Sequence, residues 1–101
     1  MYILNTSFMV DYDVHDRWLE LMRKHVAPFI REQGFDEPVF TRVLADNPEG
    51  HFTYSLQVPL PDMERYNEFT ERVLGEYRTV AAPLFGQKVL AFSTLLKKES
   101  L

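Results

Sequence analysis

The sequence of 101 residues contains no cysteine, which excludes disulfides, thiolate nucleophiles and cysteine-based zinc sites. It also contains no apolar run close to the about 20 residues that a membrane-spanning helix needs. Met1 leads directly into an expected strand, without the basic segment and apolar stretch that mark a signal peptide. From these absences we expect a cytoplasmic protein that does not interact with a membrane.

Positive charge is scarcer than negative charge. The chain has 11 lysines and arginines against 15 aspartates and glutamates, which gives a net charge of -4 and an isoelectric point near 5.3. This balance provides no general attraction to nucleic acid or to anionic lipid. Apolar residues make up 46% of the chain, enough for a single core, so we expect one domain over residues 1–101.

Four strand patterns and two helix patterns fill almost the whole chain. Alternating residues predict strands at 2–10, 38–45, 51–59 and 87–96, with a turn DNPEG at 46–50. Apolar spacing and caps predict one helix from Asp13 to about residue 33, and another from Asp62 to the region of Pro83 and Gly86. The resulting order, βαββαβ, predicts an α+β fold, the ferredoxin-like two-layer sandwich, with a four-stranded antiparallel sheet and both helices on one face.

Each predicted helix has an apolar stripe that would face the core. On the first helix the stripe is Val14, Trp18, Met22, Val26 and Phe29, and on the second it is Met63, Tyr66, Phe69, Val73, Tyr77 and Val80. Pro28 cannot donate a hydrogen bond to the carbonyl of Lys24, so we expect it to bend the first helix close to His25.

The strands at 2–10 and 51–59 are expected at the centre of the sheet, and both alternate apolar with polar residues. On the face away from the helices they would place Asn5, Ser7, Thr53, Ser55 and Gln57. We place Arg42, from the neighbouring strand, on the same open face. This face is either a solvated surface or the place where two copies meet in a homodimer and enclose a polar cavity for a small molecule.

Four segments together resemble a family of small bacterial proteins in the dimeric alpha-beta barrel superfamily. They are the opening YxLN, the helix WLELMRKHVAPF, the strand FTYSLQV and the closing FGQKVLAF. The resemblance implies a ferredoxin-like protomer that dimerises through its sheet, and it carries no established reaction and no catalytic residue. The positions that match the recurrent pattern are Asn5, Trp18, Met22, His25, Pro28 and Gln57.

Two of these positions allow more than one role. At 100° per residue His25 falls within about 20° of Trp18, on the apolar arc of the helix, so we expect it to be partly buried. It would then either make a structural hydrogen bond, to the backbone or to Asn5, or serve in ligand binding or proton transfer. Trp18 would either pack in the core or provide a stacking surface for a planar ligand.

Two familiar activities of this fold lack their machinery. An acylphosphatase-like enzyme needs a glycine-rich basic loop after the first strand, and here that loop is the acidic VDYDVHD. An RNA-recognition module would need a Gly-Phe-Gly-Phe type of spacing, which is missing.

The resemblance leaves one enzymatic alternative open. Some dimeric alpha-beta barrels degrade haem or oxidise quinols without a metal cofactor, and the haem-degrading members use an asparagine on the first strand with a tryptophan and a histidine on a helix. Asn5, Trp18 and His25 supply these residue types, but the iron-binding histidine of those enzymes belongs on the second helix, where this chain has none.

We assign no catalytic residue, no metal site and no cofactor. His15 and His25 would lie about 15 Å apart along one helix, too far to share an ion, and the acidic residues before it fit helix capping better than calcium binding. The sequence therefore favours a non-catalytic homodimer that binds a small molecule or a partner through its sheet face. The candidate ligand-binding residues are Asn5, Ser7, Trp18, His25, Arg42, Ser55 and Gln57.

Overall fold

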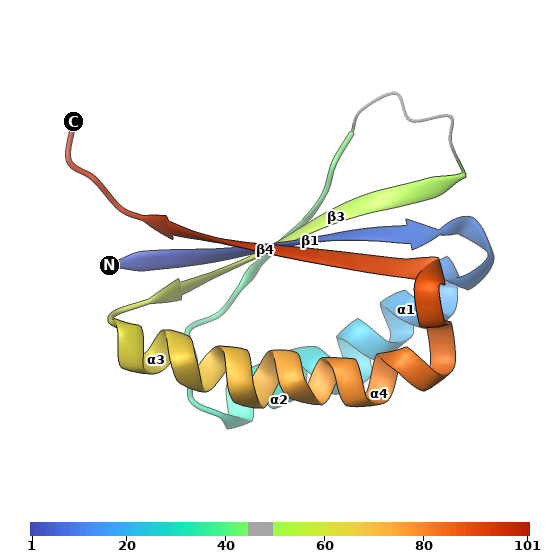
Figure 1. Ribbon diagram of the computed structural model, residues 1–101, viewed down its shortest axis with the longest axis horizontal. Helices are drawn as coiled ribbons and strands as arrows, with labels where there is room; N and C mark the ends of the chain where they lie inside the picture. Colours follow the sequence, from blue (N-terminus) through green and yellow to red (C-terminus); the bar gives the residue numbers. More distant parts are fainter. Residues whose placement is uncertain (45–49) are drawn as a thin grey trace.

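The fold is that of a computed structural model, which describes residues 1–44 and 50–101. A four-stranded antiparallel sheet has the order β2-β3-β1-β4, and both helical segments lie on one of its faces (Figure 1). The strands are β1 Tyr2–Asp11, β2 Val39–Arg42, β3 His51–Leu60 and β4 Val89–Lys97. The predicted ferredoxin-like sandwich, with the first and third strands at the centre, is confirmed.

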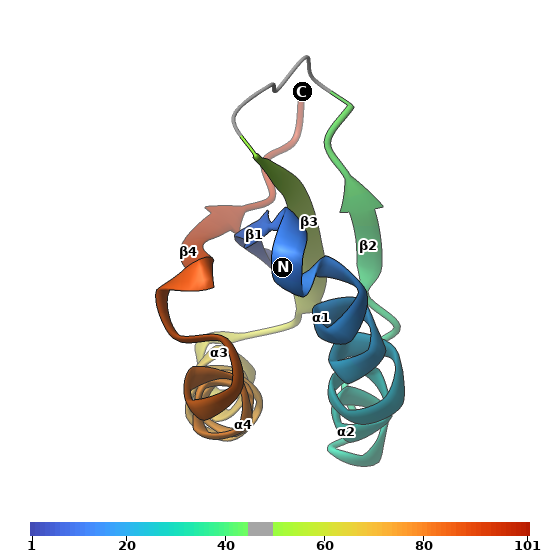
Figure 2. The same ribbon diagram turned by 90° about the vertical axis from the view of Figure 1, so that its right-hand side faces the viewer.

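Two long helical segments run side by side beneath the sheet, as Figure 2 shows, and each contains a π-helical turn. The first consists of the 3₁₀ turn η1 Tyr12–Val14, α1 His15–Leu21, the π-helical η2 Met22–Val26 and α2 Ala27–Glu32. The second consists of α3 Met63–Glu68, the π-helical η3 Phe69–Leu74 and α4 Gly75–Phe85, followed by the 3₁₀ turn η4 Gly86–Lys88. Among the described residues, no helix combines the length and the apolar composition needed to cross a membrane.

The first helical segment does not begin at the predicted cap. Oδ1 of Asp11, rather than Asp13, accepts the capping hydrogen bond, from the backbone N–H of Asp13 at 3.0 Å. Because β1 continues as far as Asp11, the chain turns there, and the Asp13 carboxylate instead accepts a hydrogen bond from Lys88. The second helix begins as predicted, since Oδ1 of Asp62 accepts from the backbone N–H of Arg65 at 2.9 Å.

The buried side of the first helical segment repeats every four residues. Its buried residues are Val14, Trp18, Met22, Val26 and Ile30. Phe29, predicted for this stripe, is only half-buried. A regular α-helix has 3.6 residues per turn, whereas a π turn closes i→i+5 hydrogen bonds and so accommodates more residues. The π turn directly precedes Ala27 and Pro28, where the proline has no N–H to continue the α-helical pattern.

The second helical segment shows the same four-residue repeat. Its buried column is Phe69, Val73, Tyr77, Ala81 and Phe85. Val80, predicted for the core, is half-buried, because the prediction assumed a regular α-helix through the π turn. Met63, also predicted for the core, is exposed at the first residue of the helix. Pro83 lies inside α4, and the helix ends at Phe85, before Gly86 with a φ of 54°.

The two central strands separate apolar from polar residues as predicted. Most residues that face the helices are apolar and buried, namely Leu4, Phe8, Val10, Tyr54, Leu56, Val58 and Leu60. The same face also holds the buried Thr6 and the half-buried Tyr2 and Phe52. On the other face Asn5 lies opposite Gln57 and Ser7 lies opposite Ser55. Strand β2 is shorter than predicted, and most of the predicted DNPEG turn lies outside the described residues.

Candidate functional site

The centre of the open sheet face is polar and carries no charge. We call this group the polar centre, and its residues are Asn5, Ser7, Thr53, Ser55 and Gln57. They come from β1 and β3, and all of them are half-buried. The hydroxyl of Ser55 donates to Oδ1 of Asn5 at 2.6 Å, which orients the carboxamide of Asn5. The two carboxamides and three hydroxyls can both donate and accept hydrogen bonds to an uncharged ligand.

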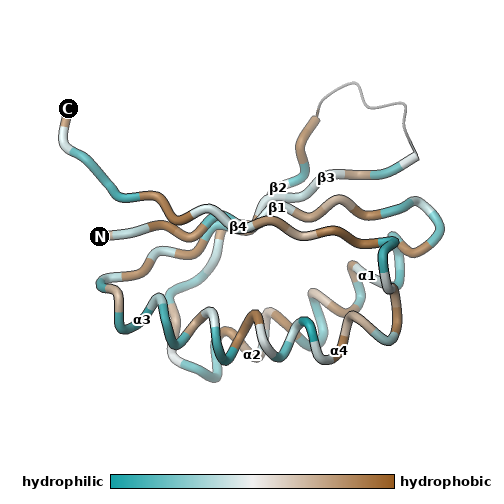
Figure 3. Tube along the Cα trace, viewed as in Figure 1, coloured by the Kyte–Doolittle hydropathy of each residue, from teal (hydrophilic) through white to brown (hydrophobic). Residues whose placement is uncertain are grey.

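An apolar border runs along one side of the polar centre. It consists of Ile3, Met9, Leu90, Phe92 and Leu96, which the pairing of β1 with β4 places on the open face. Phe92 is 60% exposed and Leu90 is 45% exposed. Figure 3 shows the hydrophobic colour along much of β4, which is an edge strand of the sheet. The open face therefore combines a hydrogen-bonding centre with a row of exposed apolar side chains.

The prediction that Arg42 lies on the open face is wrong. The register of β2 with β3 places Arg42 opposite Tyr54, a core residue, so its side chain faces the helices. Its guanidinium carbon lies 5.3 Å from the centroid of the Phe52 ring. Three of the four residues of β2 are exposed, so no apolar alternation along the strand could fix its register in advance.

Trp18 lies in the core between the sheet and the helices. It is 0% exposed, its ring centroid is 5.2 Å from that of Phe8, and its Nε1–H donates to the Tyr77 hydroxyl at 3.0 Å. Burial raises the pKa of the Tyr77 phenol, and the hydrogen bond from Trp18 acts in the opposite direction. With no exposed ring surface, Trp18 offers a ligand nothing to stack on unless the core opens.

His25 lies where the two helical segments meet, in contact with Glu76 of α4. Its Nε2 is 3.3 Å from Oε2 of Glu76, and its side chain is 43% exposed. The predicted partial burial is confirmed, whereas Asn5 as its hydrogen-bond partner is wrong. Asn5, Trp18 and His25 thus occupy the open face, the core and the helix layer, and they do not form one site.

Sequence reasoning missed the role of His15, whose side chain is 14% exposed. Its Nε2 lies 2.6 Å from the Tyr54 hydroxyl, and its ring centroid lies 4.3 Å from that of Phe52. A signal was available, because β1 leads into the helix without a loop and the first helical residues must then lie over the end of β3. Phe52 and Tyr54 are the core-facing residues of that end.

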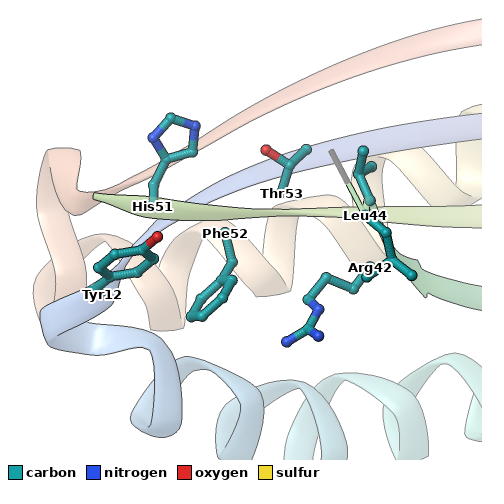
Figure 4. A pocket seen from close by; sticks show the side chains of 7 residues that line it. Tyr12, Arg42, Leu44, His51, Phe52 and Thr53 are labelled. Carbon is teal, nitrogen blue, oxygen red and sulfur yellow. The ribbon is translucent and has the colours of Figure 1, made fainter. Parts of the chain in front are cut away.

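A hollow of about 180 Å³ lies at this end of the sheet, and we call it the end pocket. It is lined by Tyr12, Arg42, Val43, Leu44, His51, Phe52 and Thr53. In Figure 4 Arg42 and Phe52 extend toward the first helical segment, while His51 and Thr53 extend to the opposite side of β3. Within the described part of the chain, no group of three His, Asp or Glu residues could hold a metal ion.

Comparison with solved structures finds proteins of the same fold. A dimeric ferredoxin-like protein from an uncultured marine organism aligns with 99% of this chain and 97% of its own, at a TM-score of 0.69 and 15% identity. A second dimeric ferredoxin-like protein from an uncultured marine organism aligns with 100% of this chain and 99% of its own, at a TM-score of 0.60 and 13% identity.

A third alignment covers 95% of this chain but only 32% of PelD from Pseudomonas aeruginosa PAO1, solved in complex with c-di-GMP, at a TM-score of 0.57 and 19% identity. At these identities the three alignments demonstrate a common fold. No protein of curated function matches the sequence significantly. Residues 1–99, nearly the whole chain, match a family described as a domain of unknown function, DUF4286, and the chain belongs to this family.

Proposed function

We propose that two copies of the chain associate through their open sheet faces and enclose a chamber that binds a small, uncharged, polar molecule. The observation that carries this proposal is the hydrogen-bonded pair of Asn5 and Ser55 in an uncharged polar centre beside an exposed apolar border. A row of exposed leucine and phenylalanine side chains does not stabilise a sheet face that contacts only solvent, and it is typical of an interaction surface.

The size of the open face supports association with a second copy. The strands β1 and β3 have ten residues each, β4 has nine and β2 has four, which at about 3.3 Å per residue and about 4.8 Å spacing gives a face of roughly 500 Å² in projection. A stable interface buries about 800 Å² of accessible surface on each partner, which a rippled face of this extent can largely provide. The two marine proteins are described as dimeric, which supports association of this chain into a dimer.

The polar centre also defines the class of ligand. It offers carboxamide and hydroxyl groups and no charged group, so it favours a neutral molecule with several hydrogen-bonding groups. Binding without catalysis is the better-supported activity, because the oxidative alternative needs Asn5, Trp18 and His25 in one site. We expect the protein to act in the cytoplasm.

Light scattering of purified variants at about 100 µM tests the interface. Phe92→Glu places a charge in the apolar border, and Leu84→Glu places the same charge on α4, at a residue of nearly equal exposure, 59% against 60%. We expect dimers for the wild type and Leu84→Glu, and monomers for Phe92→Glu. A monomeric wild type, or a Phe92→Glu variant that remains dimeric, contradicts the interface.

Native mass spectrometry of freshly purified protein tests the chamber. We expect the dimer to carry an additional small mass, and we expect Gln57→Ala to remain dimeric but to lose that mass, because it removes one carboxamide from the polar centre. Glu64→Ala, on the exposed first turn of α3, is the matched control and should keep the additional mass. A Gln57→Ala dimer that retains the mass contradicts binding at the polar centre.

A further inference from the structure

We propose that the end pocket is a second binding site and that it takes a small aromatic carboxylate. The site is separate from the polar centre, because its ligand-binding groups, Arg42 and Phe52, lie on the helix-facing side of the sheet. Figure 4 shows both side chains extending toward the first helical segment. The proposal therefore does not rest on the dimer or on the chamber between the open faces.

Arg42 provides the charge that the ligand must complement. Its guanidinium group lies over the Phe52 ring, 5.3 Å from the centroid, and no carboxylate of the described residues pairs with it. A guanidinium group presents parallel N–H donors that match the two oxygens of a carboxylate. Arg42 is therefore held against an aromatic ring, and no described residue occupies its paired donors.

Arg65 also stacks on an aromatic ring, but its guanidinium donors have hydrogen-bond acceptors within the chain. The guanidinium carbon of Arg65 lies 3.9 Å from the centroid of the Phe35 ring, so it also stacks on an aromatic residue. Its Nη1 donates to Glu68 and its Nη2 donates to the backbone carbonyl of Gln33. Arg65 thus has a structural role with its acceptors supplied by the chain, whereas the described residues supply none to Arg42.

The walls of the pocket favour a planar ring in the ligand. The Tyr12 and Phe52 ring centroids are 4.7 Å apart, and the ring of His15 lies 4.3 Å from Phe52 on the side of the helix. Tyr12 is 49% exposed, so part of this aromatic surface is open to solvent. Aromatic rings prefer offset or edge contacts with one another, at centroid distances of about 4.5 to 7 Å.

The volume of the pocket limits the size of the ligand. A hollow of about 180 Å³ corresponds to about six water molecules at their volume in the liquid, about 30 Å³ each. A single substituted ring fits this space, whereas a nucleotide or a haem group does not. Benzoate is the simplest molecule that has both the ring and the carboxylate.

Titration of ¹⁵N-labelled protein with benzoate tests the site. We expect shifts in the backbone amides of Tyr12, Phe52 and Thr53 that saturate at millimolar benzoate. Benzamide has the same shape without the charge, and acetate has the charge without the ring, and each should bind at least about tenfold more weakly than benzoate. The proposal is overturned if benzamide binds as tightly as benzoate, or if no shift saturates up to about 20 mM benzoate.

Variants of the arginine separate this site from general electrostatic attraction. Arg42→Gln should weaken benzoate binding at least about tenfold, and Arg42→Lys should recover only part of it, because lysine keeps the charge but lacks the paired donors. Arg78→Gln, an exposed arginine of α4, is the matched control and should change binding less than about twofold.

Because Arg42 is exposed, its variants should remain folded, which a circular dichroism spectrum checks. Equal weakening by Arg42→Gln and Arg78→Gln overturns the site. Shifts that centre on Asn5 and Gln57 instead assign benzoate to the polar centre and also overturn it. The same titration of the Phe92→Glu variant keeps the two proposals distinct, since we expect benzoate binding there whether or not the protein is dimeric.

Discussion

The two faces of the sheet use the same strands in opposite ways. On the covered face, aromatic and aliphatic side chains of β1 and β3 are buried against the helices. The helices complete this core, where Trp18 of α1 donates a hydrogen bond to Tyr77 of α4. At the centre of the open face, the alternate residues of the same strands are polar and half-buried, and the hydrogen bond between Ser55 and Asn5 lies near solvent. Stability is therefore concentrated on one face, and binding capacity on the other.

The largest expected effect is the loss of Trp18 from the covered face. Trp18→Ala removes a fully buried ring and should lower the free energy of unfolding by about 3 to 5 kcal/mol. Denaturant unfolding measures this change. Trp18→Phe, which keeps an aromatic ring, should cost less. If Trp18→Ala left the free energy of unfolding unchanged, stability would not be concentrated on the covered face.

The next effect concerns the buried hydrogen bond of the same face. Tyr77→Phe leaves the Nε1–H of Trp18 without its acceptor, and it should lower the free energy of unfolding by about 1 to 3 kcal/mol at neutral pH. Tyr66→Phe, in a half-buried residue of α3, is the control and should cost less.

The same substitution should change the response to alkali. Burial raises the pKa of the Tyr77 phenol in the folded protein above the usual value of 10.0, so the unfolded chain releases this proton first. The stabilisation is complete below that value and is lost as the pH rises above it. Unfolding between about pH 9 and 11 should show a steeper loss of stability for the wild type than for Tyr77→Phe.

The open face should tolerate truncation better. Asn5→Ala and Ser55→Ala each remove one partner of a half-buried hydrogen bond and should each cost about 1 kcal/mol, less than the changes at Trp18 or Tyr77. The double variant should cost less than the sum of the two, because both remove the same bond. Ser7→Ala is the control on the same face. If Asn5→Ala or Ser55→Ala lowered the free energy of unfolding as much as Trp18→Ala, the open face would also belong to the core.

A smaller effect is expected for His25→Gln in the helix layer. The pair with Glu76 is partly exposed, so the variant should lose less than about 1 kcal/mol of stability and should stay dimeric. Oxygen consumption with haem and with a panel of quinols, from about pH 5 to 8, tests the enzymatic alternative in both proteins. Turnover in the wild type that disappears in the folded variant would establish a catalytic histidine.

The smallest effect concerns the exposed pair of Asp13 and Lys88. The hydrogen bond from Lys88 lowers the pKa of the Asp13 carboxyl, with a smaller contribution from the Asp11 side chain. The pair is solvent-exposed, so Lys88→Ala should leave the thermal stability almost unchanged. An NMR titration should show the Asp13 carboxyl titrating at a higher pH in Lys88→Ala than in the wild type. The Lys24→Ala variant should leave that titration unchanged.

The sequence was sufficient to predict the sandwich, the central strands and the polar centre. These features depend on the alternation along β1 and β3, where every second residue except Thr6 is apolar and most of these residues are buried. Arg42 was misplaced because β2 is short and mostly exposed, so burial does not determine its register. The contacts of His15 arise from how the helix begins over the end of β3, which is a tertiary feature.

The predicted apolar stripes of the two helices were partly wrong for a different reason. The prediction assumed a regular α-helix. It therefore assigned Phe29 to the core in place of Ile30, and Val80 in place of Ala81. No simple residue preference signals a π turn, although Pro28 pointed to an irregularity in the first helix. Local sequence thus predicted the start of the second helix at Asp62 but not that of the first, which is capped by Asp11, and packing against the sheet determined which side of each helix is buried.

The π turns have a consequence for how this family can vary in length. A π turn is equivalent to one residue inserted into an α-helix, with the hydrogen bonds of a single turn rearranged to hold it. Removing one residue between Met22 and Val26, or between Phe69 and Leu74, would return that turn to regular α-helix and leave the residues after it on the same side of the helix. We therefore expect a family member with a one-residue gap in either turn to keep the same core residues from that point to the end of the helix.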